Sequence, residues 1–488
     1  MSAVRKSLLL SLADSYLGIA LQLASTVIIA RLLTPEELGV FAVAAVFASL
    51  ASTFRDFGVA EYLIQERDLD DRKIRAALAL NIIVSWSVAA VLMAAAPLAA
   101  SFYRTDGVAS VMRVQALCFL LVPFGAVTQA WFRRQLDYRP IVICNLLSNI
   151  AAFGVSVALA LMGFSYMSLA WSALAGIAVT VAAVAWFRPK EFPRWPALAG
   201  IGQVFAFGKF ASLIYIVAQV GKGAPELLIG RARGMADVGM YSRANGLVEM
   251  FNRLLLRPVL QVCMPYFAQA EREHGSVAPA YIRSVSILTA VGWPFLAYLA
   301  VAAWAAIRII YGTQWLEAVP VARVLCLACA IELTFLLSRE ALLACGQARP
   351  ANSLQFGLVG LQVLGLSAVF TYGLLGAAWG LVAASTLGMA LSQWQLHRVI
   401  GLDSRALARA CLPSLGLSVL AAAPMLAWHL IRPPTEASFW TFAVVGGLCT
   451  AALWLAGLRW MNHALWDELR LVGGKLLARF RPPTAESI

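Results

Sequence analysis

The chain has few charged residues for its length. Charged side chains make up 13% of its 488 residues, whereas soluble domains usually carry about 25%. It has no glycine-rich loop that would cradle a nucleotide phosphate, no zinc-ligand spacing and no nucleophile placed beside a base. These absences argue against a nucleotide-driven pump, a metalloenzyme and a hydrolase, and we expect no cofactor.

Cysteines and histidines are also sparse and do not cluster. All eight cysteines fall in apolar runs or at their ends, and the CxxC of Cys326 and Cys329 has no second pair or nearby histidine. We therefore interpret the cysteines as small residues that face lipid or other helices, with no metal site. His274 and His463 are predicted to lie in solvated loops.

Apolar residues are abundant and occur in long runs, since 61% of the residues are hydrophobic. Runs of 18 or more apolar residues predict membrane-spanning helices, and the sequence predicts an all-α polytopic membrane protein with about fourteen transmembrane spans. The expected spans are 8–30, 38–55, 76–100, 108–131, 140–161, 165–187, 203–224, 237–262, 284–307, 319–343, 351–372, 374–396, 409–431 and 438–460.

Positive charge is concentrated in alternate loops, most densely at Arg67, Arg72, Lys73 and Arg75. Because Lys and Arg are retained on the inner side of a membrane, this pattern places both termini in the cytoplasm. The formal charge of +13 therefore reflects orientation, and we expect no nucleic-acid partner.

The first two hundred residues and the second two hundred form an internal sequence repeat. Ile29-Ala30-Arg31 corresponds to Ile229-Gly230-Arg231, and Gly39 corresponds to Gly239. Six spans separate the two copies, an even number, so the sequence predicts two parallel six-helix lobes with a substrate site between them. The predicted divisions are lobes 1–195 and 196–400, a two-helix segment 401–461 and a basic cytoplasmic tail 462–488.

Polar residues form stripes on the first two helices of each lobe, at helical spacing. The stripes comprise Asp14, Ser15, Gly18, Gln22 and Ser25; Ser49, Ser52, Thr53 and Asp56; Lys209, Ser212, Gln219, Gly223 and Glu226, with Lys222 at the margin; and Asn245, Glu249, Asn252, Arg253 and Arg257. Charges that face lipid are costly, so we expect a shared aqueous cavity. The alternative is that the stripes join helices through buried pairs such as Glu249 with Arg253.

The cavity expected from these stripes is cationic, which suits an anionic cargo. Arg253 and Arg257, one helical turn apart, would bind neighbouring phosphates, because a guanidinium donates two parallel hydrogen bonds. The other candidate substrate-binding residues are Lys209, Lys222, Gln22, Gln219, Asn245 and Asn252, and the candidate ion-coupling acids are Asp14 and Glu249. Without a nucleotide motif, uphill transport would use a gradient, a membrane potential or a partner.

Several short motifs resemble the Wzx-like polysaccharide flippase branch of the multidrug/oligosaccharidyl-lipid/polysaccharide exporter superfamily, in its exopolysaccharide/colanic-acid type. Their order and spacing carry the resemblance over residues 1–400. The motifs are 28–39 (IIARLLTPEELG), 56–60 (DFGVA) with 63–65 (LIQ), 239–244 (GMYSRA), 311–315 (YGTQW) with 319–321 (VPV), and 346–349 (GQAR).

The resemblance implies a two-lobed, fourteen-helix flippase in the bacterial inner membrane. Its implied cargo is an undecaprenyl-diphosphate-linked oligosaccharide, and Arg253 and Arg257 match the family's cationic cavity residues by helix position. A polysaccharide polymerase and a chain-length regulator are candidate partners.

Three other functions fit the sequence less well, and one of them, a purely structural scaffold, leaves the polar stripes unexplained. A drug or small-metabolite exporter on the same fold should have an acid-dominated cavity, whereas the stripes here carry at least as many bases as acids. A membrane polymerase or ligase should have a large outer loop, which the sequence lacks. The expectation is a transporter and not an enzyme.

Overall fold

Helices account for the regular structure of the described residues, as expected where apolar surroundings leave the backbone no partners other than its own groups. The computed structural model describes residues 2–55, 59–189, 192–193, 195–199, 201–202, 212–431, 435 and 437–470; side chains at 2–15, 61, 212–215, 254–255, 257–258 and 261 lie outside the described set. The helices are α1 (Ser2–Leu32), α2 (Pro35–Arg55), α3 (Val59–Gln65), α4 (Asp71–Tyr103), α5 (Asp106–Leu121), α6 (Pro123–Arg134), α7 (Tyr138–Leu161), α8 (Met167–Phe187), α10 (Ser212–Arg233), α11 (Met235–Phe251), η1 (Asn252–Leu256), α12 (Arg257–His274), α13 (Ala278–Ile310), η2 (Thr313–Ala318), α14 (Val319–Glu332), α15 (Ser338–Ala344), α16 (Ala348–Leu366), α17 (Val369–Ile400), α18 (Ser404–Ile431) and α19 (Phe439–Trp460). No strand occurs within these described ranges, so the predicted all-α class is confirmed.

Many of these helices are suited to a bilayer. Among the described residues, nine helices are long and apolar enough to cross a membrane, and the bent pair α5 and α6 would make a tenth. Every span predicted from the sequence overlaps one helix or a series of successive helices. The polytopic membrane fold is therefore confirmed, while the count of fourteen spans and the orientation of the termini stay predictions.

Two breaks interrupt helices that the sequence pattern shows as continuous, and a third lies at the predicted boundary between spans 351–372 and 374–396. α5 and α6 meet at an angle of 51°, at Pro123, whose ring nitrogen cannot donate a helical hydrogen bond. Residues 333–337 separate α14 from α15. Gly373 adopts φ of 70°, a left-handed conformation that glycine tolerates, and kinks the start of α17.

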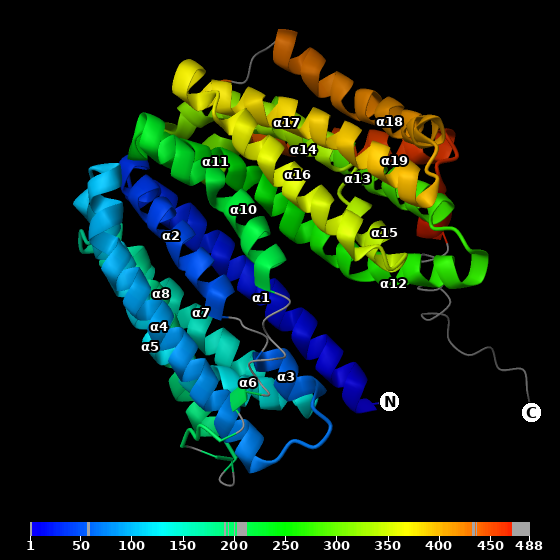
Figure 1. The fold of residues 1–488 in the computed structure, drawn as a ribbon. Helices are drawn as coiled ribbons and strands as arrows, with labels where there is room; N and C mark the ends of the chain where they lie inside the picture. Colours follow the sequence, from blue (N-terminus) through cyan, green and yellow to red (C-terminus); the bar gives the residue numbers. More distant parts are fainter. Residues whose placement is uncertain are drawn as a thin grey trace, which may run out of the picture. The chain divides into compact units, whose positions relative to one another are not determined.

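The chain forms two compact units. The first comprises residues 1–242, 310–315 and 369–374. Within it, α7 packs against α1 and α8, α5 packs against α2, α4 and α8, and α10 packs against α2 (Figure 1). These pairings place the polar faces of α1 and α7 next to each other.

Within the first unit, α2 and α11 begin side by side at equivalent positions of the sequence repeat. A Cβ at Gly39 would collide with the carbonyl of Met235, and a Cβ at Gly239 would collide with the carbonyl of Pro35. Small residues permit this close approach of two backbones. The repeat is therefore expressed as a reciprocal contact in which each glycine admits the start of the other helix.

The segment 310–315 secures the end of α1 in the same unit. The indole nitrogen of the fully buried Trp315 donates to the Ala30 carbonyl at 2.7 Å, and the Gln314 amide donates to the Leu33 carbonyl at 3.0 Å. The last carbonyls of a helix have no helical donor. The Gln-Trp motif thus supplies donors to carbonyls that would otherwise lack them.

The second unit comprises residues 243–309, 316–368 and 375–488. Here α13 is joined to α19 by side-chain hydrogen bonds, from Trp454 to the Ala290 carbonyl at 2.8 Å and from Tyr298 to the Ala443 carbonyl at 2.8 Å. In the same unit α12 packs against α15, which packs against α16.

His463 corrects a prediction, because it is not a solvated loop residue. Its side chain is buried at 4% exposure, and its Nε2 lies 3.4 Å from the Ser286 hydroxyl and 3.3 Å from the Ser414 hydroxyl. The chain turns back after α19 and brings the imidazole against α13 and α18, a tertiary contact that loop position alone does not reveal. His274, at the end of α12, is exposed as predicted.

Candidate functional site

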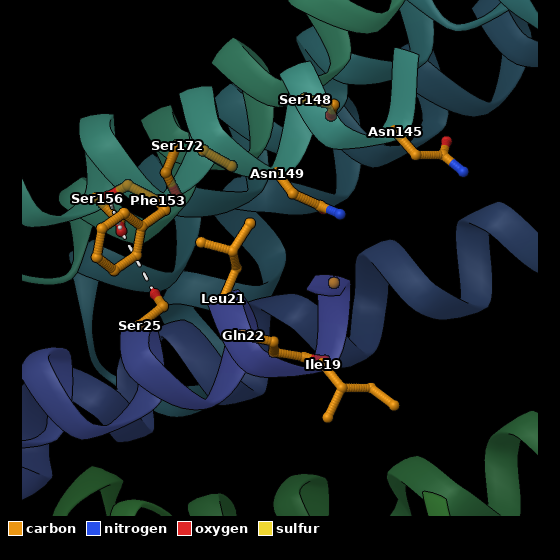
Figure 2. A pocket seen from close by; sticks show the side chains of 12 residues that line it. Ile19, Leu21, Gln22, Ser25, Asn145, Ser148, Asn149, Phe153, Ser156 and Ser172 are labelled. Atoms are coloured by element: carbon orange, nitrogen blue, oxygen red, sulfur yellow. Dashed lines mark hydrogen bonds between the residues drawn. The ribbon is translucent and has the colours of Figure 1, made fainter. Parts of the chain in front are cut away.

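A polar pocket of about 510 Å³ lies in the first unit, between α1 and α7 (Figure 2). Its size falls within the range of small-molecule sites. Amide and hydroxyl side chains dominate its polar lining, and no charged residue is among the described residues that line it. The lining residues are Gly18, Ile19, Leu21, Gln22, Ser25, Asn145, Ser148, Asn149, Ala152, Phe153, Ser156 and Ser172.

Helical spacing produces this lining from both sides. Gly18, Gln22 and Ser25 follow one another at intervals of four and three on α1. On α7, Ser148 and Asn149 lie three and four residues after Asn145, so they share its face. Gly18 permits the contact, since a Cβ there would lie 3.3 Å from the Asn149 amide nitrogen. The two polar faces therefore meet with little intervening side chain.

The serines of the pocket are mostly satisfied by neighbouring groups. Ser148 donates to the Gly176 carbonyl at 2.9 Å, Ser156 donates to the Phe153 carbonyl at 2.9 Å, and the Ser25 and Ser156 hydroxyls lie 3.5 Å apart (Figure 2). Gln22 and Asn149 are both exposed to the pocket, and within the described part of the chain neither amide has a protein partner. These amides are available to donate to and accept from a ligand.

The stripes predicted from the sequence include the α1 side of this pocket and do not include the α7 side. Gln22 and Ser25 were identified as part of a stripe, whereas Asn145, Ser148, Asn149 and Ser156 were not, although they recur on one face of the predicted span 140–161. The signal is a polar stripe without charge. It is weaker than the charged stripes because serine and asparagine are common inside membrane helices.

A second polar group lies in the second unit, where α11 gives way to η1. Arg253 Nε donates to Glu249 Oε1 at 3.3 Å, and the Asn252 amide donates to Glu249 Oε2 at 3.4 Å. The Arg253 side chain is 40% exposed and the Glu249 side chain 35% exposed, so the pair remains accessible. The pairing of Glu249 with Arg253, which the alternative reading gives as buried, is present but accessible, and it leaves part of the guanidinium for other acceptors.

The helix that carries Arg253 is a π-helix, and this changes the expected spacing. η1 spans Asn252–Leu256, and π-turns are rare segments that recur at functional sites. Pro258 follows and cannot donate to a carbonyl one α-helical turn earlier. Because a π-turn takes about one residue more than an α-turn, the backbone at Arg257 lies less than one turn after Arg253.

Part of the stripe on α10 serves helix packing. The Gln219 amide donates to the Ser49 hydroxyl at 3.0 Å, and a Cβ at Gly223 would collide with Val46 of α2. For these two residues the structure favours the alternative in which polar residues join helices. Lys222, between them in sequence, is exposed.

Of the remaining predicted site residues, the structure describes some and not others. Asn245 is half-buried on α11. Lys209 and the side chains of Asp14 and Arg257 lie outside the described residues. The described members fall into separate groups: Gln22 with the α7 pocket, Gln219 with α2, and Glu249, Asn252 and Arg253 together. Across the described residues no cluster of three or more His, Cys, Asp or Glu side chains could hold a metal ion.

Comparison with known proteins decides the family. The profile of the family described as polysaccharide biosynthesis protein matches residues 28–320, more than half of the chain. The chain belongs to this polysaccharide biosynthesis family. The match begins near the end of α1 and includes α2, α7, α10, α11 and η1. It therefore contains the α7 side of the pocket and the group around Arg253, whereas Gln22 and Ser25 precede it.

Two relatives are similar over much of this chain. The teichuronic acid biosynthesis protein TuaB of Bacillus subtilis (strain 168) is 28% identical over 71% of this chain and 73% of its own. The succinoglycan biosynthesis transport protein ExoT of Rhizobium meliloti (strain 1021) is 26% identical over 63% of this chain, and the match spans 62% of its own length. The predicted resemblance to polysaccharide transporters is confirmed.

Solved structures show that the family member has a transporter fold. A lipid II flippase MurJ in an inward closed conformation matches 93% of this chain and all of its own, with a TM-score of 0.73 at 12% identity. An inward-facing multidrug resistance transporter of the MATE family matches 80% of this chain and 96% of its own, with a TM-score of 0.61 at 15% identity. One fold thus serves both a lipid flippase and a drug exporter, so the cargo must be argued from the sites.

Proposed function

We propose that this family member is a flippase that moves an undecaprenyl-diphosphate-linked oligosaccharide from the inner to the outer leaflet of a bacterial inner membrane. Two parallel six-helix lobes with two further helices, both termini in the cytoplasm, would alternate access to a site within the membrane. A polymerase and a chain-length regulator would act on the product. The flippase would not form or break covalent bonds.

The uncharged polar pocket between α1 and α7 is the observation that carries this proposal. Sugar hydroxyls both donate and accept hydrogen bonds, and the free amides of Gln22 and Asn149 do the same. A sugar cannot cross hydrocarbon without such partners, because each unpaired polar group costs several kcal/mol. An uncharged lining offers little to a drug cation, which would need an acidic partner.

Arg253 supplies the second part of the proposal, recognition of the diphosphate. Its guanidinium is exposed and pairs with the half-exposed Glu249 through the Nε–Oε1 contact at 3.3 Å, and Arg is the side chain best suited to phosphate oxygens. Displacement of Glu249 by phosphate would free the carboxylate to take up a proton or sodium ion. Arg257, Lys209 and Lys222 would add positive charge, and Asp14 is the second candidate for ion coupling.

Reconstituted vesicles can separate sugar recognition from diphosphate recognition. Fluorescent undecaprenyl diphosphate would be compared with and without the oligosaccharide, for wild type, Gln22→Leu/Asn149→Leu and Arg253→Gln. The pocket variant should lose about tenfold or more in flipping of the glycosylated lipid only, whereas Arg253→Gln should slow both lipids by a similar factor. Arg253→Lys should retain part of the activity because it keeps the charge and loses the planar fork.

Matched variants control for general damage. Asn352→Leu on α16 and Arg323→Gln on α14, an exposed arginine, should flip both lipids at the wild-type rate. Equal losses for both lipids in the pocket variant would remove the sugar assignment, and wild-type rates in Arg253→Gln would remove the phosphate assignment. Export of small organic cations without lipid flipping would establish the drug-exporter alternative.

A further inference from the structure

A second pocket of the first unit has a different chemistry from the sugar pocket. It has a volume of about 350 Å³ and lies where α4, α6 and α8 meet the end of α2 and the start of α3. Two arginines, two amides and one hydroxyl share its walls with apolar side chains. The lining residues are Arg55, Val59, Ala60, Asn81, Val122, Gly125, Ala126, Gln129, Ala130, Arg133, Ile177, Thr180 and Val181.

The break between α5 and α6 positions one wall of this second pocket. The 51° bend at Pro123 redirects α6, so that Gly125, Gln129 and Arg133, at intervals of four, line the pocket along one face. α6 is then held to α3 by Arg134, whose guanidinium donates to the carbonyls of Leu63 at 2.9 Å and Arg67 at 3.2 Å. The position of Arg133 is therefore fixed by its neighbour.

Adjacent arginines on α6 have different roles. Arg134 is half-buried and its donors are used by the end of α3. Arg133 is exposed, and within the described part of the chain its guanidinium has no hydrogen-bond or ion-pair partner. A cationic side chain that lines a pocket and is not used by the fold is available for an anion.

Donor groups outnumber acceptors in the rest of the lining. Asn81 is buried at 7% exposure and accepts from the Ser85 hydroxyl at 3.4 Å, which leaves its amide hydrogens for the pocket. Arg55 adds a second guanidinium, with its Cζ 5.9 Å from the centre of the Phe119 ring. No carboxylate is among the described residues that line the pocket. Such an arrangement favours an oxyanion with several acceptor oxygens.

Apolar walls accompany these donors and indicate what the anion is attached to. Val59, Val122, Ile177 and Val181 line the same space, and the hydrocarbon chains of lipids are apolar groups that a polytopic membrane protein meets. We propose that this pocket binds the phosphate headgroup of a lipid, with Arg133 on the phosphate, Arg55 as added positive charge in the same lining, and the apolar walls against the first carbons of the chains. The pocket is separate from the residues assigned above to sugar and diphosphate, so its occupancy does not depend on the proposed cargo.

Lipid binding to the full-length protein in detergent tests this site directly. Native mass spectrometry would count bound phosphatidylglycerol and phosphatidylcholine, with pyrophosphate as a soluble competitor. Arg133→Gln should weaken phosphatidylglycerol binding about tenfold or more, because a charge-assisted contact is lost, and Arg133→Lys should fall between Arg133→Gln and wild type. Arg139→Gln, an exposed arginine at the start of α7 outside the pocket, should bind like wild type.

Two results would overturn the assignment of this pocket to a lipid phosphate. Equal binding by wild type and Arg133→Gln, with unchanged melting temperatures, would overturn the proposal. Full displacement of the lipid by millimolar pyrophosphate would overturn the lipid assignment in favour of a soluble phosphate compound. Because Arg253→Gln should bind phosphatidylglycerol normally, a failure of lipid flipping would leave this result intact.

Discussion

Individual polar side chains in these helices are of two kinds. Ser52 and Thr53 bond to the Ser49 carbonyl within their own helix, at 2.8 and 3.0 Å, and such residues cost little in an apolar environment. Gln22 and Asn149 have two donors and an acceptor each that no described residue uses. The second kind requires water or a ligand, and it marks the pocket better than the number of polar residues does.

His463 provides a test at the scale of one side chain. Burial lowers the pKa of its imidazole below the ordinary value of about 6.5, and its Nδ1 accepts from the Leu465 backbone N–H at 3.2 Å. The folded protein therefore favours the neutral form of the His463 imidazole. The stability it contributes is fully present above about pH 6.5 and falls as the pH drops below that value, because the unfolded chain then binds the proton more readily.

Thermal unfolding between pH 5 and 8 measures this effect of His463. The melting temperature of wild type should decrease below about pH 6.5, and His463→Gln should flatten that decrease at the cost of lower stability throughout. His274→Gln, at an exposed position, should keep the wild-type profile. A profile for His463→Gln that matches wild type would show that another group titrates.

The prediction of single residues from sequence succeeded where charge made a pattern obvious. Arg253 and Glu249 are paired as their four-residue spacing indicates. His463 was placed wrongly because its partners Ser286 and Ser414 are distant in sequence. The α7 asparagines were overlooked because a neutral stripe carries a small energetic penalty and so a weak signal.

Helices as elements were predicted well in position and less well in continuity. Apolar length fixes where a helix lies, so each expected span overlaps an observed one. Breaks at 122–123 and 333–337 and the π-turn at 252–256 depend on local competition for backbone hydrogen bonds. An assumption of uniform helical rotation cannot detect them. The joint role of Arg253 and Arg257 stays a prediction, because the Arg257 side chain lies outside the described residues.

The crossing of α2 and α11 gives a prediction at the scale of the element. Gly39→Ala or Gly239→Ala would place a methyl group against a backbone carbonyl of the other helix, so each should destabilise this conformation by about 1–3 kcal/mol through overpacking. Thermal unfolding and a cross-link between cysteines introduced at Pro35 and Met235 would report the loss. Gly154→Ala on α7, where a Cβ meets nothing within 4 Å, is the matched control.

The double variant makes the test of the crossing sharper. If the two glycines maintain one reciprocal contact, Gly39→Ala/Gly239→Ala should cost less than the sum of the single variants, because the first methyl group already separates the helices. Wild-type stability and cross-linking in both single variants would contradict the close approach.

At the scale of the whole molecule, orientation was inferred from the charge of the loops. The account predicts that the C-terminus and the loop at Arg67 are cytoplasmic and that the loop at Gly163 is outside. Fusions of alkaline phosphatase and of a fluorescent protein after these positions would report the side of each. Phosphatase should be active only after Gly163, and activity at the C-terminus would contradict the orientation and the even number of spans.

The central claim is that the molecule moves a sugar-bearing diphosphate lipid across a bilayer. Purified protein in vesicles, loaded with fluorescent undecaprenyl-diphosphate oligosaccharide in both leaflets, allows the fraction accessible to an external quencher to be followed over time. Flipping should bring nearly all of the lipid within reach of the quencher, whereas vesicles without protein should stay near half. An accessible fraction that remains near half, in vesicles whose protein is folded and inserted, would contradict the account.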